Sequence, residues 1–508
     1  MKQSQHQVTR VKSYGVNNFR ALKRMPMLDI KPITLLFGSN GIGKSSFLNS
    51  LDLFRSLILP RSGNYDVFRL DENLNLGTYS DIISFNDEQG ELIFRFRLHN
   101  YRIDQLFPAI EFGRSINFNH ELFGNPPDIG LTLVFRKHAL RENLMELVSW
   151  EISDEANDFY LNFNRTAQGK HNRSVRIGKI DSREIEISAD EYGPLCELYS
   201  LYLEYAADIR SILAPAGSSG DENEVFCFYD EFPAEEKDRI INKARELFPH
   251  DEIDKDVIFG EGSRSMVNLR NASDLLGRLI APYYNYIIFS LRHTFWKMQR
   301  LKGVRDEVPR GFIIGDPRNS VIQNDLYHDI ISVFEDSVKL EKFNAIIQEL
   351  GFGEKILLEG SKGMYQAFVR SNNALVNFAD MSSGFKQVLP MLLKIVSAPD
   401  SVLLMEQPEL HLHPKLQVDL IRIIAATPGC RIIETHSEHM VRKLQLMIAR
   451  GEIARDEIAI YFFENDDSGT VVQKLTILEN GFFKDPWPNG FFDDGYNLSK
   501  ELIFAQKS

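Results

Sequence analysis

The chain has 508 residues, 43% of them hydrophobic, so it can bury more than one sizeable core. Its 58 basic and 71 acidic residues give a net charge of −13, which argues against a general nucleic-acid coat or a polybasic membrane-surface protein. Three cysteines without a CxxC pair exclude a disulfide scaffold and a cysteine-rich zinc site, and they suit a reducing cytoplasm. The N-terminus lacks the apolar core of a secretory signal, and the longest apolar runs, such as 283–291, are too short to span a membrane.

The first part of the chain predicts strands around a glycine-rich turn. Residues 11–36 alternate in polarity, an apolar run fills 33–37, and helical spacing follows at 47–59. The glycine-rich stretch GSNGIGKSS lies between that apolar run and the helix. Further alternating segments predict an antiparallel β lobe; they are 91–98, 129–137, 159–166 and 183–188.

The second part predicts a helical region and then a return to mixed structure. The pattern is helical from 194 to about 301, whereas 401–406 and 431–437 predict buried strands and 415–425 predicts a helix. The fold class is therefore α/β. The predicted boundaries are 1–190 for an N-terminal lobe with the β lobe, 191–345 for a helical insertion, 346–450 for a C-terminal lobe and 451–508 for a small C-terminal domain.

The glycine-rich stretch fits the phosphate-binding loop GxxxxGK[ST] at every fixed position. Successive backbone N–H groups of such a loop point at phosphates, the Lys44 ammonium reaches the β and γ phosphates, and the Ser45 hydroxyl ligates Mg²⁺. ATP and Mg²⁺ are the expected cofactors. The residues expected to contact nucleotide here are Ser39, Asn40, Gly41, Gly43, Lys44, Ser45 and Ser46.

The strand at 401–406 ends in a carboxylate that is expected to lie beside Ser45 and the metal, namely Glu406. Gln407 follows, at the position where many ATPases of this layout carry a glutamate as general base. An amide cannot accept a proton at neutral pH, so slow hydrolysis is expected. Glu409 could take the missing role, or it could be a charge at a helix start.

Histidines follow the strand at 431–437. His436 is placed to bond the γ-phosphate or the attacking water. His411, His413 and His439 leave open a zinc site or an HNH-type nuclease centre, although no cysteine joins them and each fits the ATPase pattern.

Two further segments carry functional hypotheses. The helix that opens in DMSSGFKQVLPMLLKI places Ser383 and Gly384 where backbone N–H groups could bind a γ-phosphate, or where they simply cap the helix. The segment 292–305 combines five basic residues with Phe295 and Trp296, so it could follow a phosphate backbone or be a solvated helix face.

The order of these motifs resembles the ABC-type ATPase head of the SMC, Rad50 and RecN group. The NNFRAL segment resembles the N-terminal strand of those heads, which implies a nucleotide contact for Arg20. More narrowly, MEQPELHLHPKLQ and ETHSEHMVRKL resemble the PtuA-like and OLD-like ATPases of bacterial antiphage systems. The run at 457–494 resembles a small domain of unknown function that is common in that branch.

The resemblance implies a homo-oligomer, a dimer of heads or a higher even number, with ATP sandwiched between one P-loop and the opposing Ser383-Gly384 signature. The catalytic group would comprise Lys44, Glu406, Gln407 and His436, with Ser45 and Glu406 as metal ligands. The chain after His436 is too short for the Toprim nuclease domain of OLD proteins, so the resemblance implies a separate effector, an HNH nuclease. The leading hypothesis is a sensor or scaffold subunit; the alternative is a DNA-repair ATPase of RecF or Rad50 type, and the large insertion argues against a transporter.

Overall fold

The computed structural model forms two compact units, one of residues 1–12, 19–55 and 293–508 and the other of residues 13–18 and 56–292. The structure describes residues 11–58, 67–70, 74, 76–84, 90–99, 128–138, 144–154, 159–165, 172–178, 185–190, 287, 290–303, 305, 307–313, 325–361, 364–466 and 469–484.

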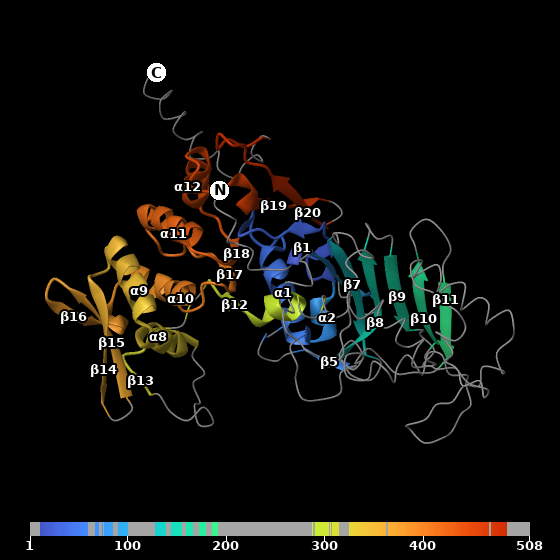
Figure 1. Cartoon of the computed structure of the whole chain (residues 1–508), viewed down its shortest axis with the longest axis horizontal. Coiled ribbons are helices and arrows are strands. Elements are labelled where there is room, and N and C mark those ends of the chain that lie inside the picture. The colour runs from blue at the N-terminus through green and yellow to red at the C-terminus, as the bar shows by residue number, and fades with distance from the viewer. Residues whose placement is uncertain are drawn as a thin grey trace, which may run out of the picture. The chain divides into compact units, whose positions relative to one another are not determined.

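The first unit is built on a mainly parallel sheet (Figure 1). Its strand order is β12 (Met298–Leu301), β17 (Val402–Glu406), β18 (Cys430–Glu434), β4 (Ile33–Gly38), β19 (Ile458–Asp466) and β20 (Gly469–Leu475). All neighbours are parallel except the β19–β20 hairpin. The carboxyl ends of five strands therefore meet at one edge, where ligands bind in open α/β sheets. The predicted α/β class is confirmed.

The central strands are buried throughout because both faces of the sheet are covered. Every residue of β4 and β18 is buried, as a parallel strand between helical layers requires. Four helices of this unit bury one apolar face each. They are α1 (Lys44–Ile58), α10 (Ser383–Ser397), α11 (Pro414–Ala426) and α12 (Glu438–Ala449). The predicted strand–turn–helix at the glycine-rich loop is confirmed.

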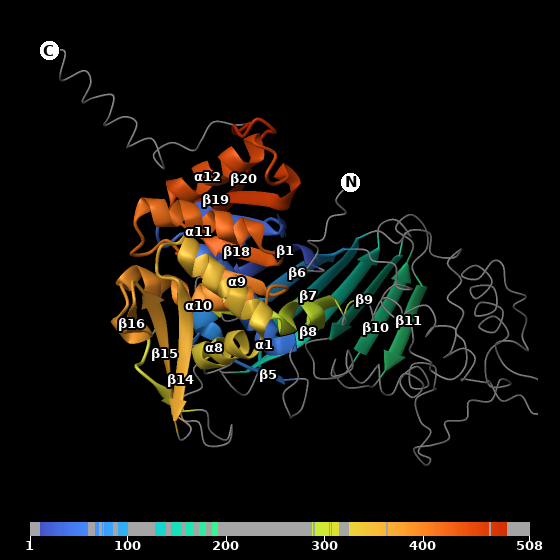
Figure 2. The same ribbon diagram turned by 60° about the vertical axis from the view of Figure 1, so that its left-hand side comes forward.

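A helix pair and a small antiparallel sheet belong to the same unit (Figure 2). The helices are α8 (Asp325–Glu335) and α9 (Ser337–Glu349), and the strands are β13 (Phe312–Ile313), β14 (Lys355–Ser361), β15 (Met364–Ser371) and β16 (Ala374–Asn377). Helix α8 packs on α10, and α9 packs on β14. A buried ion pair between Lys394 Nζ and Asp329 Oδ2, 2.9 Å apart, joins α10 to α8.

The second unit is a meander of antiparallel strands, as the alternating segments predict. The strand order is β11 (Ile185–Asp190), β10 (Asn172–Gly178), β9 (Phe159–Arg165), β8 (Leu144–Asp154), β7 (Ile129–Lys137), β6 (Leu92–Leu98) and β1 (Val11–Phe19), with β5 (Val67–Arg69) paired to β8. Residues of β6 and β7 alternate between buried and less buried positions, because one face of each strand packs on the core. A short helix, α2 (Tyr79–Ile82), precedes β6.

The helical prediction for 194–301 is wrong at its end, and most of that segment lies outside the described residues. Residues 290–296 are helical, but Met298–Leu301 forms β12 and pairs in parallel with β17. Four residues are too few to show the two-residue period of a strand. The strand conformation of β12 therefore depends on its pairing with the buried strand β17.

The C-terminal segment contributes to the main sheet. Strand β19 pairs in parallel with β4, with Phe463 opposite Gly38, and β20 closes the edge. The acids of this hairpin, Glu464 and Asp466, are exposed at its tip. Within the described ranges, no helix is long and apolar enough to cross a membrane.

Arg431 ties the amino ends of β17 and β18 together. Its buried guanidinium donates hydrogen bonds to the backbone oxygens of Pro399, Ser401, Pro428 and Cys430, at 2.6 to 3.1 Å. Burial lowers the pKa of Arg431 to about 10, so the group stays charged at neutral pH. The carbonyl dipoles satisfy the guanidinium N–H groups, and the nearby charge of Asp400 also favours the charged form of Arg431.

Candidate functional site

The glycine-rich loop joins β4 to α1 and needs its glycines for backbone shape and for space. Gly38, Gly41 and Gly43 have φ values of +137°, +78° and +105°, which strain residues with a Cβ. A Cβ on Gly38 would collide with the carbonyl of Phe463, and one on Gly43 would lie 2.7 Å from Leu22 Cδ2. Close packing against β19, and against the segment that precedes β4, therefore restricts these two positions of the loop to glycine.

The Lys44 ammonium lies inside this loop. Its Nζ donates to the backbone oxygens of Gly38 (3.0 Å) and Ser39 (2.6 Å), and the residue is buried. Burial lowers the pKa of Lys44, while Glu434 acts in the opposite direction. The outer face of the loop is open to solvent, since Ser39, Asn40, Gly41 and Ser45 are exposed.

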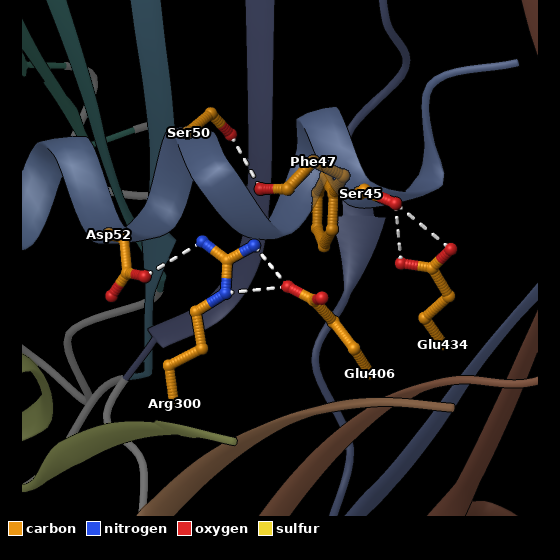
Figure 3. A network of polar contacts seen from close by, with 7 residues as sticks. All are labelled: Ser45, Phe47, Ser50, Asp52, Arg300, Glu406 and Glu434. Carbon is orange, nitrogen blue, oxygen red and sulfur yellow. Dashed lines mark hydrogen bonds and ion pairs between the residues drawn. The ribbon is translucent and has the colours of Figure 1, made fainter. Parts of the chain in front are cut away.

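Ser45 has a carboxylate partner that the sequence analysis did not single out. Ser45 Oγ lies 2.8 and 3.0 Å from the two carboxylate oxygens of Glu434, at the end of β18, and Glu406 is the register neighbour of Glu434 on β17 (Figure 3). Burial raises the pKa of Glu434, whereas the Ser45 hydroxyl and Lys44 counteract the rise. The sequence carries a signal for this residue, because Glu434 ends a buried strand as Glu406 does.

Glu406 is held by a separate ionic network. Arg300, on β12, donates through Nε to Glu406 Oε1 at 2.8 Å and through Nη1 to Asp52 Oδ2 at 2.8 Å, and its Nη2 also contacts Glu406 (Figure 3). Asp52 lies on α1, where Ser50 Oγ donates to the backbone oxygen of Phe47 at 2.7 Å. Burial lowers the pKa of Arg300, but the two carboxylates outweigh it and leave the pKa raised.

The residues after Glu406 form hydrogen bonds with the end of β18 and with the loop that carries His436. Gln407 has a left-handed backbone with φ +41°, and its N–H donates to the backbone oxygen of Glu434 at 2.7 Å. His436 N donates to Glu409 Oε1 at 2.7 Å. Burial raises the pKa of Glu409 and lowers that of His436, which Lys44 lowers further. Glu409 is thus a half-buried acid bound to this loop, and the expectation of a helix-start charge is wrong because α11 begins only at Pro414.

The signature residues lie at the start of α10. Ser382 caps this helix by accepting a hydrogen bond from Phe385 N at 3.3 Å, and Ser383 is exposed in its first turn. Arg20 has φ +50°, and its guanidinium lies 5.8 Å from the centroid of the Phe19 ring. The predicted roles of Arg20, Ser383 and Gly384 toward nucleotide stay predictions.

Two hypotheses from the sequence lose support. His413 caps α11, accepting from Lys415 N at 3.4 Å, and the described residues contain no group of three or more His, Cys, Asp or Glu arranged to hold a metal. In the basic segment, Arg300 is engaged as described above. Arg305 donates through Nη1 to the backbone oxygen of Gln387 at 2.6 Å, and burial lowers its pKa to about 10. Neither arginine faces solvent as a phosphate-tracking residue would.

The sequence does not predict the contact between Thr470 and the P-loop. Thr470, on β20, has its Oγ1 2.9 Å from the backbone oxygen of Ala21 and 3.1 Å from that of Ile42, within the P-loop. A Cβ on Gly43 would lie 3.3 Å from the same hydroxyl. The C-terminal hairpin therefore touches the nucleotide-binding loop directly.

Comparisons with known proteins give structural similarities and family matches. No curated protein matches the chain. Among solved structures, similarity is found to an SMC head bound to the C-terminal winged-helix domain of ScpA (12% identity, TM-score 0.38, covering 92% of this chain and 97% of that one). The other two are an SMC head bound to the C-terminal domain of ScpA from Pyrococcus furiosus (11%, TM-score 0.36, covering 97% and 99%) and the SMC head from Thermotoga maritima (9%, TM-score 0.36, covering 92% and 100%).

Two family models match the sequence. Residues 453–502 match a family described as "Protein of unknown function (DUF3696)". Residues 33–442, which run from the P-loop strand past His436, match a second family. Because that match covers most of the chain, this protein belongs to the family described as "AAA domain, putative AbiEii toxin, Type IV TA system".

Proposed function

We propose that this chain binds Mg-ATP at the carboxyl edge of its main sheet and acts as a nucleotide-controlled sensor or scaffold subunit of an antiphage defence complex. The observation that carries the binding site is the convergence of the P-loop, Ser45, Glu434 and Glu406 on one edge. The family description, which names a toxin and a toxin–antitoxin system, supports a role in defence.

The side chains at this edge suit a triphosphate with its cation. Phosphate oxygens would accept charge-assisted hydrogen bonds from Lys44, in place of the two loop carbonyls that it now contacts. Mg²⁺ prefers oxygen ligands and is held with nucleotide by one or two carboxylates, phosphates and waters. Ser45 and a strand-end carboxylate, Glu406 by its motif or Glu434 by its contact, fit that preference. When bound, the ion neutralises the charge that develops on the phosphates.

The residues expected near the attacking water predict slow ATP hydrolysis. Gln407 can orient water but cannot take its proton, and His436 and Glu409 are joined through the loop backbone. We therefore expect hydrolysis below about 1 s⁻¹, the low end of usual enzyme rates. Bound ATP would then stabilise one state of the protein by mass action.

The proposed assembly is a pair of heads, or a higher even number, acting in the cytoplasm. Ser383 and Gly384, at the open start of α10, would meet the nucleotide of the partner head. As in PtuA-like systems, the cutting activity would belong to a separate HNH nuclease whose access to its target depends on the nucleotide state. The chain itself would carry no nuclease centre.

The decisive experiment is a nucleotide titration of wild type, Lys44→Ala and the control Lys415→Ala. Lys415 is an exposed lysine in the first turn of α11. Lys44→Ala should abolish measurable Mg-ATP binding because it removes the cation inside the loop, whereas Lys415→Ala should bind as wild type does. Equal affinities for wild type and Lys44→Ala would refute the proposed site.

A further inference from the structure

Two glutamates stand side by side at the edge of the sheet, and they have different partners. Glu406 and Glu434 are register partners at the ends of the parallel strands β17 and β18, so their side chains leave the sheet in the same direction. Their charges repel, and Glu406 contributes to the raised pKa of Glu434. Two neighbouring carboxylates can both stay ionised where nearby cations offset their repulsion.

One of the two already has a cationic partner. Arg300 contacts Glu406 with two nitrogens and Asp52 with a third, and all three side chains are largely buried. Both nitrogens meet the same carboxylate oxygen, Glu406 Oε1, and such charge-assisted hydrogen bonds are strong. The position of Glu406 and part of its charge are therefore already committed to Arg300.

The other glutamate faces a group that cannot satisfy it. Both carboxylate oxygens of Glu434 lie within 3.0 Å of Ser45 Oγ, yet a serine hydroxyl carries a single hydrogen to donate. The hydroxyl can therefore serve both oxygens only by sharing its one hydrogen between them, and it brings no positive charge to the carboxylate. Ligands of an octahedral Mg²⁺ with bonds of 2.0–2.1 Å lie about 2.9 Å apart at right angles, which is close to these distances.

We propose that Glu434 is the carboxylate that binds the nucleotide-associated Mg²⁺ together with Ser45, while Arg300 holds Glu406 beside it as a positioning residue. The assignment rests on the proposed ATP site and goes beyond the motif, which points to Glu406. It divides the roles of the two acids: Glu434 faces the cation, and Glu406 with Asp52 fixes β12 and α1 around it.

The test measures how the affinity for a fluorescent ATP analogue, mant-ATP, depends on the Mg²⁺ concentration, from EDTA to saturation, in the full-length protein. The variants are Glu434→Gln, Glu434→Asp, Glu406→Gln and the control Glu438→Gln. Glu438 is half-buried in the first turn of α12, where it pairs with Arg442. Glutamine at 434 keeps an acceptor for the Ser45 hydroxyl, so the change removes charge rather than the hydrogen bond.

Glu434→Gln should raise the Mg²⁺ concentration for half-maximal effect by about tenfold or more, since even indirect partners of a metal contribute 10–100-fold in affinity. Affinity in EDTA should be unchanged or tighter, because a negative charge near the phosphates is gone. Glu434→Asp should recover part of the Mg²⁺ dependence, and Glu438→Gln should match wild type. A Glu434→Gln protein with wild-type Mg²⁺ dependence, or a shift in Glu406→Gln alone, overturns the assignment. Failure of wild type to bind mant-ATP at any Mg²⁺ concentration would instead refute the ATP site itself.

Discussion

Removing the Thr470 hydroxyl should weaken nucleotide binding from outside the P-loop. Thr470 is buried, and its single hydroxyl hydrogen is shared between the carbonyls of Ala21 and Ile42. Thr470→Val keeps the volume but leaves these carbonyls without that donor, at a cost of about 1–3 kcal/mol. If about 0.7 to 1.4 kcal/mol of this cost falls on the nucleotide-binding conformation of the loop, the affinity for Mg-ATP falls by about three- to tenfold.

The assay is a nucleotide titration alongside a thermal melt. Thr470→Ser keeps the hydroxyl and should bind nearly as wild type does. Thr427→Val is the matched control, because Thr427 Oγ1 donates to a single carbonyl, that of Ile424 at the end of α11, at 3.0 Å. It should lower stability without changing affinity. A Thr470→Val protein that melts earlier but binds Mg-ATP as tightly as Thr427→Val does would show that the contact only stabilises the fold.

Three further outcomes follow from named contacts. Gln407→Glu should raise steady-state phosphate release, because a carboxylate can take the proton of the attacking water; a slower variant would assign that role to another residue. Arg431→Met should cost about 3 kcal/mol or more in thermal or urea unfolding, since four carbonyls lose a charged donor, whereas exposed Arg442→Met should change stability by less than about 1 kcal/mol. Cys430, whose pKa burial raises to about 12, should resist iodoacetamide at pH 8 in the native protein and react once it is unfolded, as peptide mapping would show; rapid native labelling would contradict its burial.

The P-loop could be predicted because its chemistry is contiguous. A loop that surrounds phosphates with backbone N–H groups needs glycines, a lysine and a hydroxyl at fixed spacing. The segment from Gly38 to Ser45 can therefore be identified from sequence alone. The structure adds that Gly38 and Gly43 are also needed to avoid Phe463 and Leu22. The strands β4, β17 and β18 were equally visible, since a continuous apolar run is the local consequence of burial on both faces.

The alternating strands of the second unit were predicted for the same reason. A period of two residues is written into each segment wherever one face is buried, as in β6 and β7. Strand β12 was missed because four residues next to a helix carry almost no period, and only its pairing with β17 makes them a strand.

The partners at the site were decided by tertiary structure alone. Ser45 and Glu434 are 389 residues apart in sequence, and Arg300 joins an acid of α1 to an acid of β17. The sequence shows that Glu406 and Glu434 each end a buried strand, so both must reach the same edge. Which of them meets Ser45 depends on strand order and register, which arise from packing between distant segments rather than from any local pattern. For the same reason the C-terminal hairpin, which from sequence is a small separate domain, lies beside β4 and places Thr470 against the P-loop.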